Sequence, residues 1–205
     1  MSEISVTQAE ISDVAGFDDP VMGSQRIFRM LLDAMSSPGK VINSDIPLQA
    51  PAPLLATSAA ICLTLLDRET LLWLDAKADQ PQVRDYLRFH CGCMLTARAK
   101  EAHFALIADA LCVAPLGQFE LGTDEEPERS ATLIIQVKAL SSEGGLKLTG
   151  PGIEAARHLH IAPFPPSFLQ QVVLNQSLFP RGLDFVFASP NQIAAIPRSS
   201  KIEVQ

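Results

Sequence analysis

The sequence predicts an α/β fold in which a mixed central sheet is flanked by helices, giving three layers (α/β/α). Helical apolar periods alternate with short apolar runs along most of the 205 residues, and proline or glycine separates many of them. The alternation is interrupted near residues 132–150, where extended runs indicate a hairpin. Because a chain of this length can bury a substantial core, we expect one domain spanning residues 1–205.

The first predicted helix begins near Asp19 and ends near Ser37. Asp19 and Pro20 supply a helix cap and a first helical residue. A wide apolar stripe follows at helical spacing, formed by Ile27, Phe28, Leu31, Leu32 and Met35. We expect this stripe to be buried, with Leu32 and Met35 in the core.

The helix should stop at Ser37, because a serine before proline is pushed out of the helical region and Pro38-Gly39 favours a turn. Residues 41–42 should then be extended. Arg29 lies off the apolar stripe, where it serves either a partner or the structure. The residues assigned either a partner-binding or a structural role are Arg29, Met35, Pro38 and Gly39.

The remaining elements are predicted from apolar runs and their flanking caps. We expect further helices at residues 54–66, from 79 to about 90, and at 165–177, and strands at residues 71–74, 103–107, 132–137, 183–188 and 192–196. Asp79 is the expected cap of the helix that has Pro81 in its first turn. The helix at 54–66 is apolar all round, which predicts that it is heavily buried.

Two stretches between these elements are typical of connections. Residues 122–130 have no apolar period and carry four acidic side chains, so we expect a solvated loop. Gly144-Gly145 should join two extended runs as a hairpin.

Composition narrows the possible partners. A net charge of -7, a pI near 5.0 and the absence of a lysine-arginine run argue against nucleic acid. The most apolar window is too short to cross a membrane, and the N-terminus lacks the basic start of a signal peptide, so we expect a cytoplasmic protein whose residues 1–18 form a partly mobile arm. With 47% hydrophobic and 19% charged residues, some apolar surface should be covered by a partner or, in a homodimer, by a second copy.

A series of motifs extends from about Gly16 to the C-terminal region. In chain order they are Phe28-Arg29, Leu31-Leu32, Ala34-Met35-Ser36, Pro38-Gly39, Leu63-Thr64-Leu65, Trp73-Leu74, Leu87-Arg88-Phe89-His90, Ala131-Thr132-Leu133-Ile134, Gln136-Val137, Leu148-Thr149-Gly150-Pro151-Gly152-Ile153, Phe179-Pro180, Gly182-Leu183-Asp184 and Ala195-Ile196-Pro197-Arg198. In this order they resemble the bacterial phosphonate metabolism protein known as the H subunit of the carbon-phosphorus lyase system. The chain departs from the family pattern at Cys91-Gly92-Cys93, Ser130 and Ser199-Ser200.

The resemblance implies an architecture shared with pyridoxal-phosphate transferases but without the cofactor. It also implies a non-catalytic or unassigned role in a complex with the G, I and J subunits. Such subunits together attach a phosphonate to the ribose C1 of ATP with loss of adenine, which forms ribose 1-phosphonate 5-triphosphate, and the J subunit then breaks the carbon-phosphorus bond by radical chemistry. The chain has no iron-sulfur cysteine triad, which agrees with a radical step on another subunit.

One stretch is a candidate for ligand binding. The turn at residues 149–153 could offer backbone N-H groups to a phosphate, with Arg157 and His158 a few residues on. The alternative is a rigid turn, because glycine beside proline is foremost turn chemistry and the spacing is not that of a Walker loop. The candidate ligand-binding residues are Thr149, Gly150, Gly152, Arg157 and Arg198. They also carry the rival function, an independent enzyme or binding protein for a small phosphate or phosphonate; no catalytic residue is assigned.

Few residues of the chain are candidates for binding a metal or a cofactor. His90, Cys91, Cys93 and His103 could nominate a metal site, but a second ligand pair at zinc spacing is missing, which favours reduced, metal-free thiols. No lysine sits in an apolar segment that would suit a Schiff base, so no cofactor is expected. The six lysines are Lys40, Lys77, Lys100, Lys138, Lys147 and Lys201.

Overall fold

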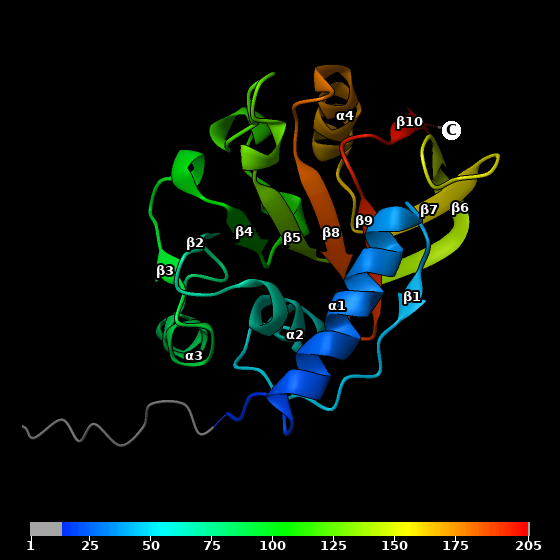
Figure 1. The fold of residues 1–205 in the computed structure, drawn as a ribbon. Helices are drawn as coiled ribbons and strands as arrows, with labels where there is room; N and C mark the ends of the chain where they lie inside the picture. Colours follow the sequence, from blue (N-terminus) through cyan, green and yellow to red (C-terminus); the bar gives the residue numbers. More distant parts are fainter. Residues whose placement is uncertain (1–13, 205) are drawn as a thin grey trace, which may run out of the picture.

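A seven-stranded mixed sheet forms the centre of the computed structural model, which describes residues 14–204 (Figure 1). Its strands lie in the order β1-β9-β8-β5-β4-β2-β3. Their bounds are Ile42–Asn43 (β1), Leu71–Leu74 (β2), Met94–Leu95 (β3), Phe104–Ile107 (β4), Thr132–Gln136 (β5), Asp184–Ala188 (β8) and Gln192–Ile196 (β9). Strands β8, β5, β4, β2 and β3 run parallel, whereas β9 is antiparallel to both β8 and β1. The predicted mixed sheet is confirmed.

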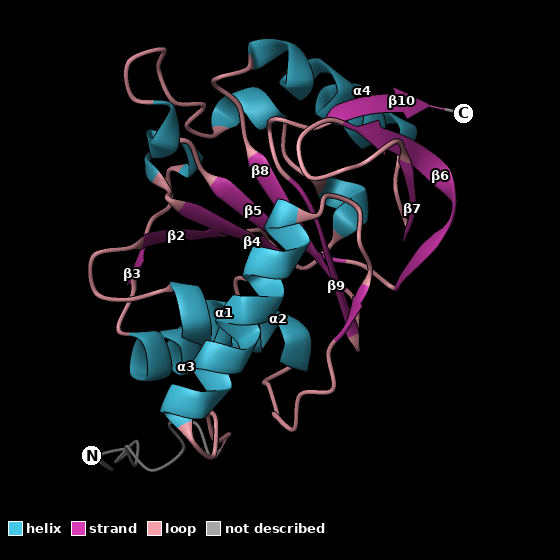
Figure 2. Ribbon diagram, turned by 45° about the vertical axis from the view of Figure 1, so that its right-hand side comes forward, coloured by secondary structure: helices cyan, strands magenta, loops and turns pink. Residues whose placement is uncertain are grey.

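Three helices cover one face of this sheet, as Figure 2 shows. They are α1 (Pro20–Ser36), α2 (Ala56–Leu65) and α3 (Pro81–Cys91). Helix α2 is buried between the sheet and its neighbours, as its uniformly apolar sequence predicts, and α1 packs on α2 and β9. The expected cap of α1 is confirmed, because the Asp19 carboxylate accepts hydrogen bonds from the backbone N-H groups of Val21 and Met22.

The opposite face is covered by one helix and a second sheet. These elements are α4 (Pro166–Asn175) and the antiparallel strands β6 (Ala139–Thr149), β7 (Arg157–Ala162) and β10 (Lys201–Val204), in the order β10-β6-β7. Phe168 of α4 packs edge-on against Phe185 of the central sheet. Short 3-10 helices complete the chain at Ala99–Glu101, Ala110–Cys112, Leu116–Gln118, Pro127–Arg129 and Gln176–Leu178. The outer layer on this face is therefore part helix and part sheet.

Two local predictions are wrong. Gly144-Gly145 does not turn a hairpin; both residues lie inside β6, where pairing with β7 shifts register between Ser141 and Leu146. A glycine pair suits a β-bulge as well as a hairpin, and the turn instead follows β6. Asp79 does not cap α3: the N-cap is Gln80, and Asp79 forms an ion pair with Arg84 that lowers the pKa of the Asp79 carboxyl.

The predicted arm at residues 1–18 lies mostly outside the described residues. Its last part contacts the helical layer, where the His90 ring Nε2 lies 3.0 Å from the Val14 carbonyl oxygen. Within the described residues, none of the helices combines the length and the apolar character that a membrane span requires.

Candidate functional site

The outward side of α1 carries an uncovered apolar strip. Ile27, Leu31 and Ala34 face the core and are buried. Leu32, which the sequence predicts to be core, is 52% exposed, and Phe28 is 47% exposed. The prediction fails because consecutive helical residues are about 100° apart, so a stripe this wide cannot face the sheet across its whole width.

The strip continues toward the start of the helix. Val21 lies seven residues before Phe28 and is 76% exposed, so Val21, Phe28 and Leu32 follow one side of the helix; we call these three residues the α1 outer strip. Figure 1 shows α1 on the outside of the helical layer. Arg29 beside the strip is exposed, and it has neither an ion pair nor a hydrogen bond to any residue between 14 and 204. An apolar strip with an adjacent cation is suited to docking on another protein surface.

The other predicted residues of this helix are tied into the structure. Met35 is half-buried and packs against the helical core. Pro38 and Gly39 are buried, and the Gly39 N-H donates to the Ala195 carbonyl of β9 at 2.9 Å. The helix stop is therefore a structural joint between α1 and the sheet.

The candidate phosphate turn is packed against this joint. Gly152 adopts a positive φ of 80°, and a Cβ there would overlap the Ser36 carbonyl oxygen at the end of α1. Arg157 donates from Nη1 to the Pro38 carbonyl at 2.9 Å. Thr149 and Gly150 lead into the turn, which closes with the Ile153 N-H donating to the Gly150 carbonyl. Gly152 and Arg157 thus serve close packing, and phosphate binding stays a prediction.

The Arg198 side chain makes its contacts away from the candidate phosphate turn. Its guanidinium pairs with the Asp184 carboxylate, with Nη2 2.6 Å from Oδ2, and its Nη1 donates to the Pro127 carbonyl. Both side chains of the pair are largely buried, at 17% and 13% exposed. A buried arginine whose donors are occupied in this way has a structural role.

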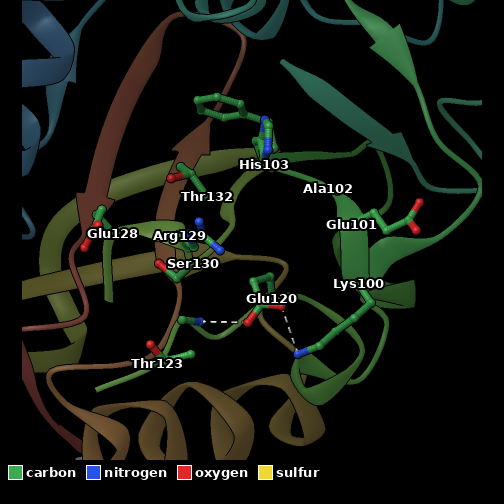
Figure 3. Close-up of a pocket in the computed structure, with 12 residues that line it drawn as sticks. Lys100, Glu101, Ala102, His103, Glu120, Thr123, Glu128, Arg129, Ser130 and Thr132 are labelled. Atoms are coloured by element: carbon green, nitrogen blue, oxygen red, sulfur yellow. Dashed lines mark hydrogen bonds and ion pairs between the residues drawn. The ribbon is translucent and has the colours of Figure 1, made fainter. Parts of the chain in front are cut away.

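A cavity of about 670 Å³, large enough for a small ligand, lies where β4 and β5 begin (Figure 3). Lys100 lies 3.4 Å from Glu120, whose other carboxylate oxygen accepts from the Gly122 N-H. The Ser130 hydroxyl in the wall is buried and has no hydrogen-bond partner among the described residues. The cavity mixes acidic and basic side chains, and no one ligand charge is favoured. The sequence does not predict this cavity, because residues 122–130 have no apolar period and are typical of a solvated loop.

A second cavity, of about 360 Å³, lies at the carboxyl ends of β4 and β5, the edge at which open α/β sheets usually bind ligands. Lys77 and Lys138 contribute to its wall and are exposed. Gln136 braces the same wall, because its side chain accepts from the Leu55 N-H and donates to the Pro53 carbonyl. The wall carries two lysines and one carboxylate, Asp109, so its charge leans positive, which the positions of Lys77 and Lys138 in the sequence did not indicate.

The candidate metal ligands are not gathered into one site. His90 contacts the Val14 carbonyl, whereas His103 lies in the wall of the larger cavity and accepts the Leu71 N-H at Nδ1. No group of three or more His, Cys, Asp or Glu side chains within residues 14–204 is arranged to hold a metal ion. Three of the six lysines are in ion pairs: Lys40 with Asp33, Lys100 with Glu120 and Lys147 with Glu203.

The fold and these surfaces define an α/β protein with a mixed sheet, in which Arg157 and Arg198 make contacts inside the chain and the first helix presents an outward apolar strip. The chain belongs to the bacterial phosphonate metabolism protein (PhnH) family, whose defining sequence pattern matches residues 15–203. This confirms the family predicted from the sequence motifs.

Two relatives match most of the chain. The alpha-D-ribose 1-methylphosphonate 5-triphosphate synthase subunit PhnH of Rhizobium meliloti (strain 1021) is 36% identical over 189 residues, which cover 91% of this chain and 94% of that protein. The putative C-P lyase subunit protein HtxG of Stutzerimonas stutzeri is 30% identical over 184 residues, covering 88% of this chain and 86% of that protein. Both relatives are described as subunits, so the family works within larger assemblies.

Proposed function

We propose that this chain is a non-catalytic subunit of the complex that joins a phosphonate to the ribose of ATP, forming ribose 1-phosphonate 5-triphosphate. The 36% identity to a synthase subunit over 94% of that subunit's length carries the proposal. Its partners are the G, I and J subunits of carbon-phosphorus lyase. Because the reaction consumes ATP, the complex works in the cytoplasm.

The non-catalytic role is supported by the contacts of Arg157 and Arg198, the two arginines among the candidate ligand-binding residues. Arg157 donates to a backbone carbonyl of the α1 joint, and Arg198 is held by Asp184. Arg198 cannot bind a substrate phosphate without breaking contacts inside the chain, and Arg157 is tied to the α1 joint through Nη1. The chain instead contributes a surface.

We assign that surface to the α1 outer strip. Exposed aromatic and aliphatic side chains next to an arginine are the residue types that dominate the energy of protein interfaces. In the isolated chain, a second copy covers the same strip and makes a homodimer. Light scattering should give the mass of two chains at micromolar concentration, and the mass of one chain would contradict the homodimer.

The experiment for the complex is co-expression of the chain with tagged G, I and J subunits. The proposal expects the chain to co-purify with the tagged subunits, and a strain lacking the chain to lose growth on methylphosphonate as sole phosphorus source. A complex of the other subunits that assembles and supports growth without the chain would contradict the proposal.

The rival function, an independent binder of a small phosphate or phosphonate, is predicted from the sequence at the turn of residues 149–153 with Arg157 or Arg198. Because both arginines make contacts inside the chain, the lysine-containing cavity at the carboxyl ends of β4 and β5 is the alternative place for such a ligand. Calorimetry on the isolated chain separates the two functions. Micromolar binding of ATP or methylphosphonate, abolished in a Lys77→Ala/Lys138→Ala variant, would support the rival. The subunit proposal expects no heat of binding from either compound.

A further inference from the structure

The segment Cys91-Gly92-Cys93 places two thiols at the end of α3. Cys91 is the last residue of the helix, and Gly92 adopts the left-handed conformation (φ 68°) that ends it. A chain folded this tightly brings the Cα atoms of Cys91 and Cys93 to within about 5–6 Å, given 3.8 Å between consecutive Cα atoms. Disulfides bridge Cα separations of about 4.4–6.8 Å. The two residues therefore lie within the range of Cα separations that a disulfide bridges.

The two thiols differ in access and in acidity. Cys91 is partly exposed, whereas Cys93 is buried beneath α3, with its sulfur 3.9 Å from the Leu87 carbonyl oxygen. Hydrogen bonding between the two side chains lowers the pKa of Cys93 and raises the pKa of Cys91. For Cys93, burial and the charge of Asp67 oppose this lowering of the pKa, whereas the charge of Arg88 adds to it. Cys93 is thus the better thiolate, and Cys91 is the thiol that a solvent-borne molecule meets first.

Two neighbouring groups complete the cluster. The Tyr86 hydroxyl is buried without a hydrogen-bond partner among the described residues and lies close enough to Cys62 and Cys91 to feel their charge. An orphaned hydroxyl costs free energy, and a sulfur anion formed nearby would give it an acceptor. The Arg68 side chain lies against Gly92, which adds a second cation beside Arg88.

We propose that Cys91 and Cys93 are a redox-active dithiol that closes reversibly to an intramolecular disulfide by exchange with a low-molecular-weight disulfide such as glutathione disulfide. The Cys93 thiolate takes the proton of Cys91, and Cys91 Sγ then attacks one sulfur of the small disulfide, which leaves the other half bonded to Cys91; the released small thiolate takes the proton back from Cys93. The Cys93 thiolate then attacks Cys91 Sγ and releases the second small thiol. The two protein thiols are oxidised by two electrons, the small disulfide is reduced by two, and the two thiol protons end on the released thiols.

The site goes beyond the proposed function, because that function assigns no role to Cys91 or Cys93. Buried Cys62 is the third thiol of the cluster, and burial raises its pKa. It is the poorer participant, since reactivity follows thiolate character and access.

The test uses the full-length chain carrying Cys112→Ser, because Cys112 is exposed and would form an adduct of its own. After incubation with glutathione disulfide, thiol titration in denaturant should fall from three thiols to one, and peptide mass spectrometry should find Cys91 linked to Cys93 with no glutathione retained. Dithiothreitol should restore all three thiols. Three surviving thiols, or a stable glutathione adduct on Cys91, would overturn the proposal.

Two further variants in the same background identify the partners. Adding Cys93→Ser should trap glutathione on Cys91, because no thiolate remains to release it. Adding Cys62→Ser should leave disulfide formation unchanged. Loss of the disulfide in the Cys62→Ser variant, with circular dichroism and thermal melting unaltered, would show that Cys62 is the true partner and that the assignment is wrong.

Discussion

The two sides of α1 have similar sequences and different surroundings. Leu31 on the inward side is 5% exposed, whereas Leu32, the next residue, is 52% exposed. Both are leucines in the same turn of the same helix, so neither propensity nor composition distinguishes them. The contrast shows that one apolar helix can bury one side in its own fold and leave the other side exposed, and the exposed side is the surface that we propose another protein covers.

The largest expected loss of stability follows from a change on the inward side of α1. Leu31→Ala should lower the free energy of unfolding by about 2–5 kcal/mol, because a cavity remains where the buried side chain packed. Urea unfolding followed by circular dichroism measures this change. A loss below about 1 kcal/mol would mean that the inward side is not part of the core.

The second-largest loss of stability should come from a change at the joint between the end of α1 and the sheet. Arg157→Ala removes the hydrogen bond from Nη1 to the Pro38 carbonyl and should cost about 1–2 kcal/mol, because the carbonyl loses a charged donor. Thermal melting of this variant beside Arg157→Lys is the measurement. If Arg157 instead binds a substrate anion, stability will be unchanged while growth on phosphonate fails.

Leu32→Ala on the outward side should change the unfolding free energy by less than about 1 kcal/mol, since an exposed leucine leaves no cavity. The same denaturation experiment compares it directly with Leu31→Ala. Equal losses in the two variants would erase the contrast between the two sides of the helix.

The smallest effect on stability should come from Arg29→Ala, which should stay within about 0.5 kcal/mol of the parent chain because Arg29 is exposed. Its effect should appear in assembly, as weaker co-purification with the partner subunits. A large fall in melting temperature, with assembly reduced only in proportion to the folded protein lost, would assign Arg29 to the structure.

Much of the fold could be predicted because its signals are local. Asp19 and Pro20 mark where α1 begins, and the apolar run at 192–196 coincides with β9. The burial of Leu32 could not be predicted, because an apolar period states how wide a stripe is and not how much of it the chain itself covers. The bulge at Gly144-Gly145 was misread for a related reason, since a glycine pair signals unusual backbone angles without specifying the pairing.

The candidate site was harder to predict because its contacts are distant in sequence. Arg157 reaches Pro38 across 119 residues, and no local pattern announces that meeting. The cavity beside Ser130 forms only when residues 122–130 fold against the starts of β4 and β5. The cysteine motif differs, because only Gly92 separates Cys91 from Cys93, so their closeness is local, although the sequence itself favours reduced, metal-free thiols.

The most direct test of the outer strip is co-purification of the Leu32→Asp variant with tagged G, I and J subunits, beside Leu174→Asp as a matched control. Leu174 lies on α4 and is 67% exposed, so both changes place a charge on an exposed leucine. Docking through α1 predicts that Leu32→Asp melts like the parent chain but is lost from the complex, whereas Leu174→Asp is retained. A folded Leu32→Asp chain that co-purifies at parental stoichiometry would contradict the assignment.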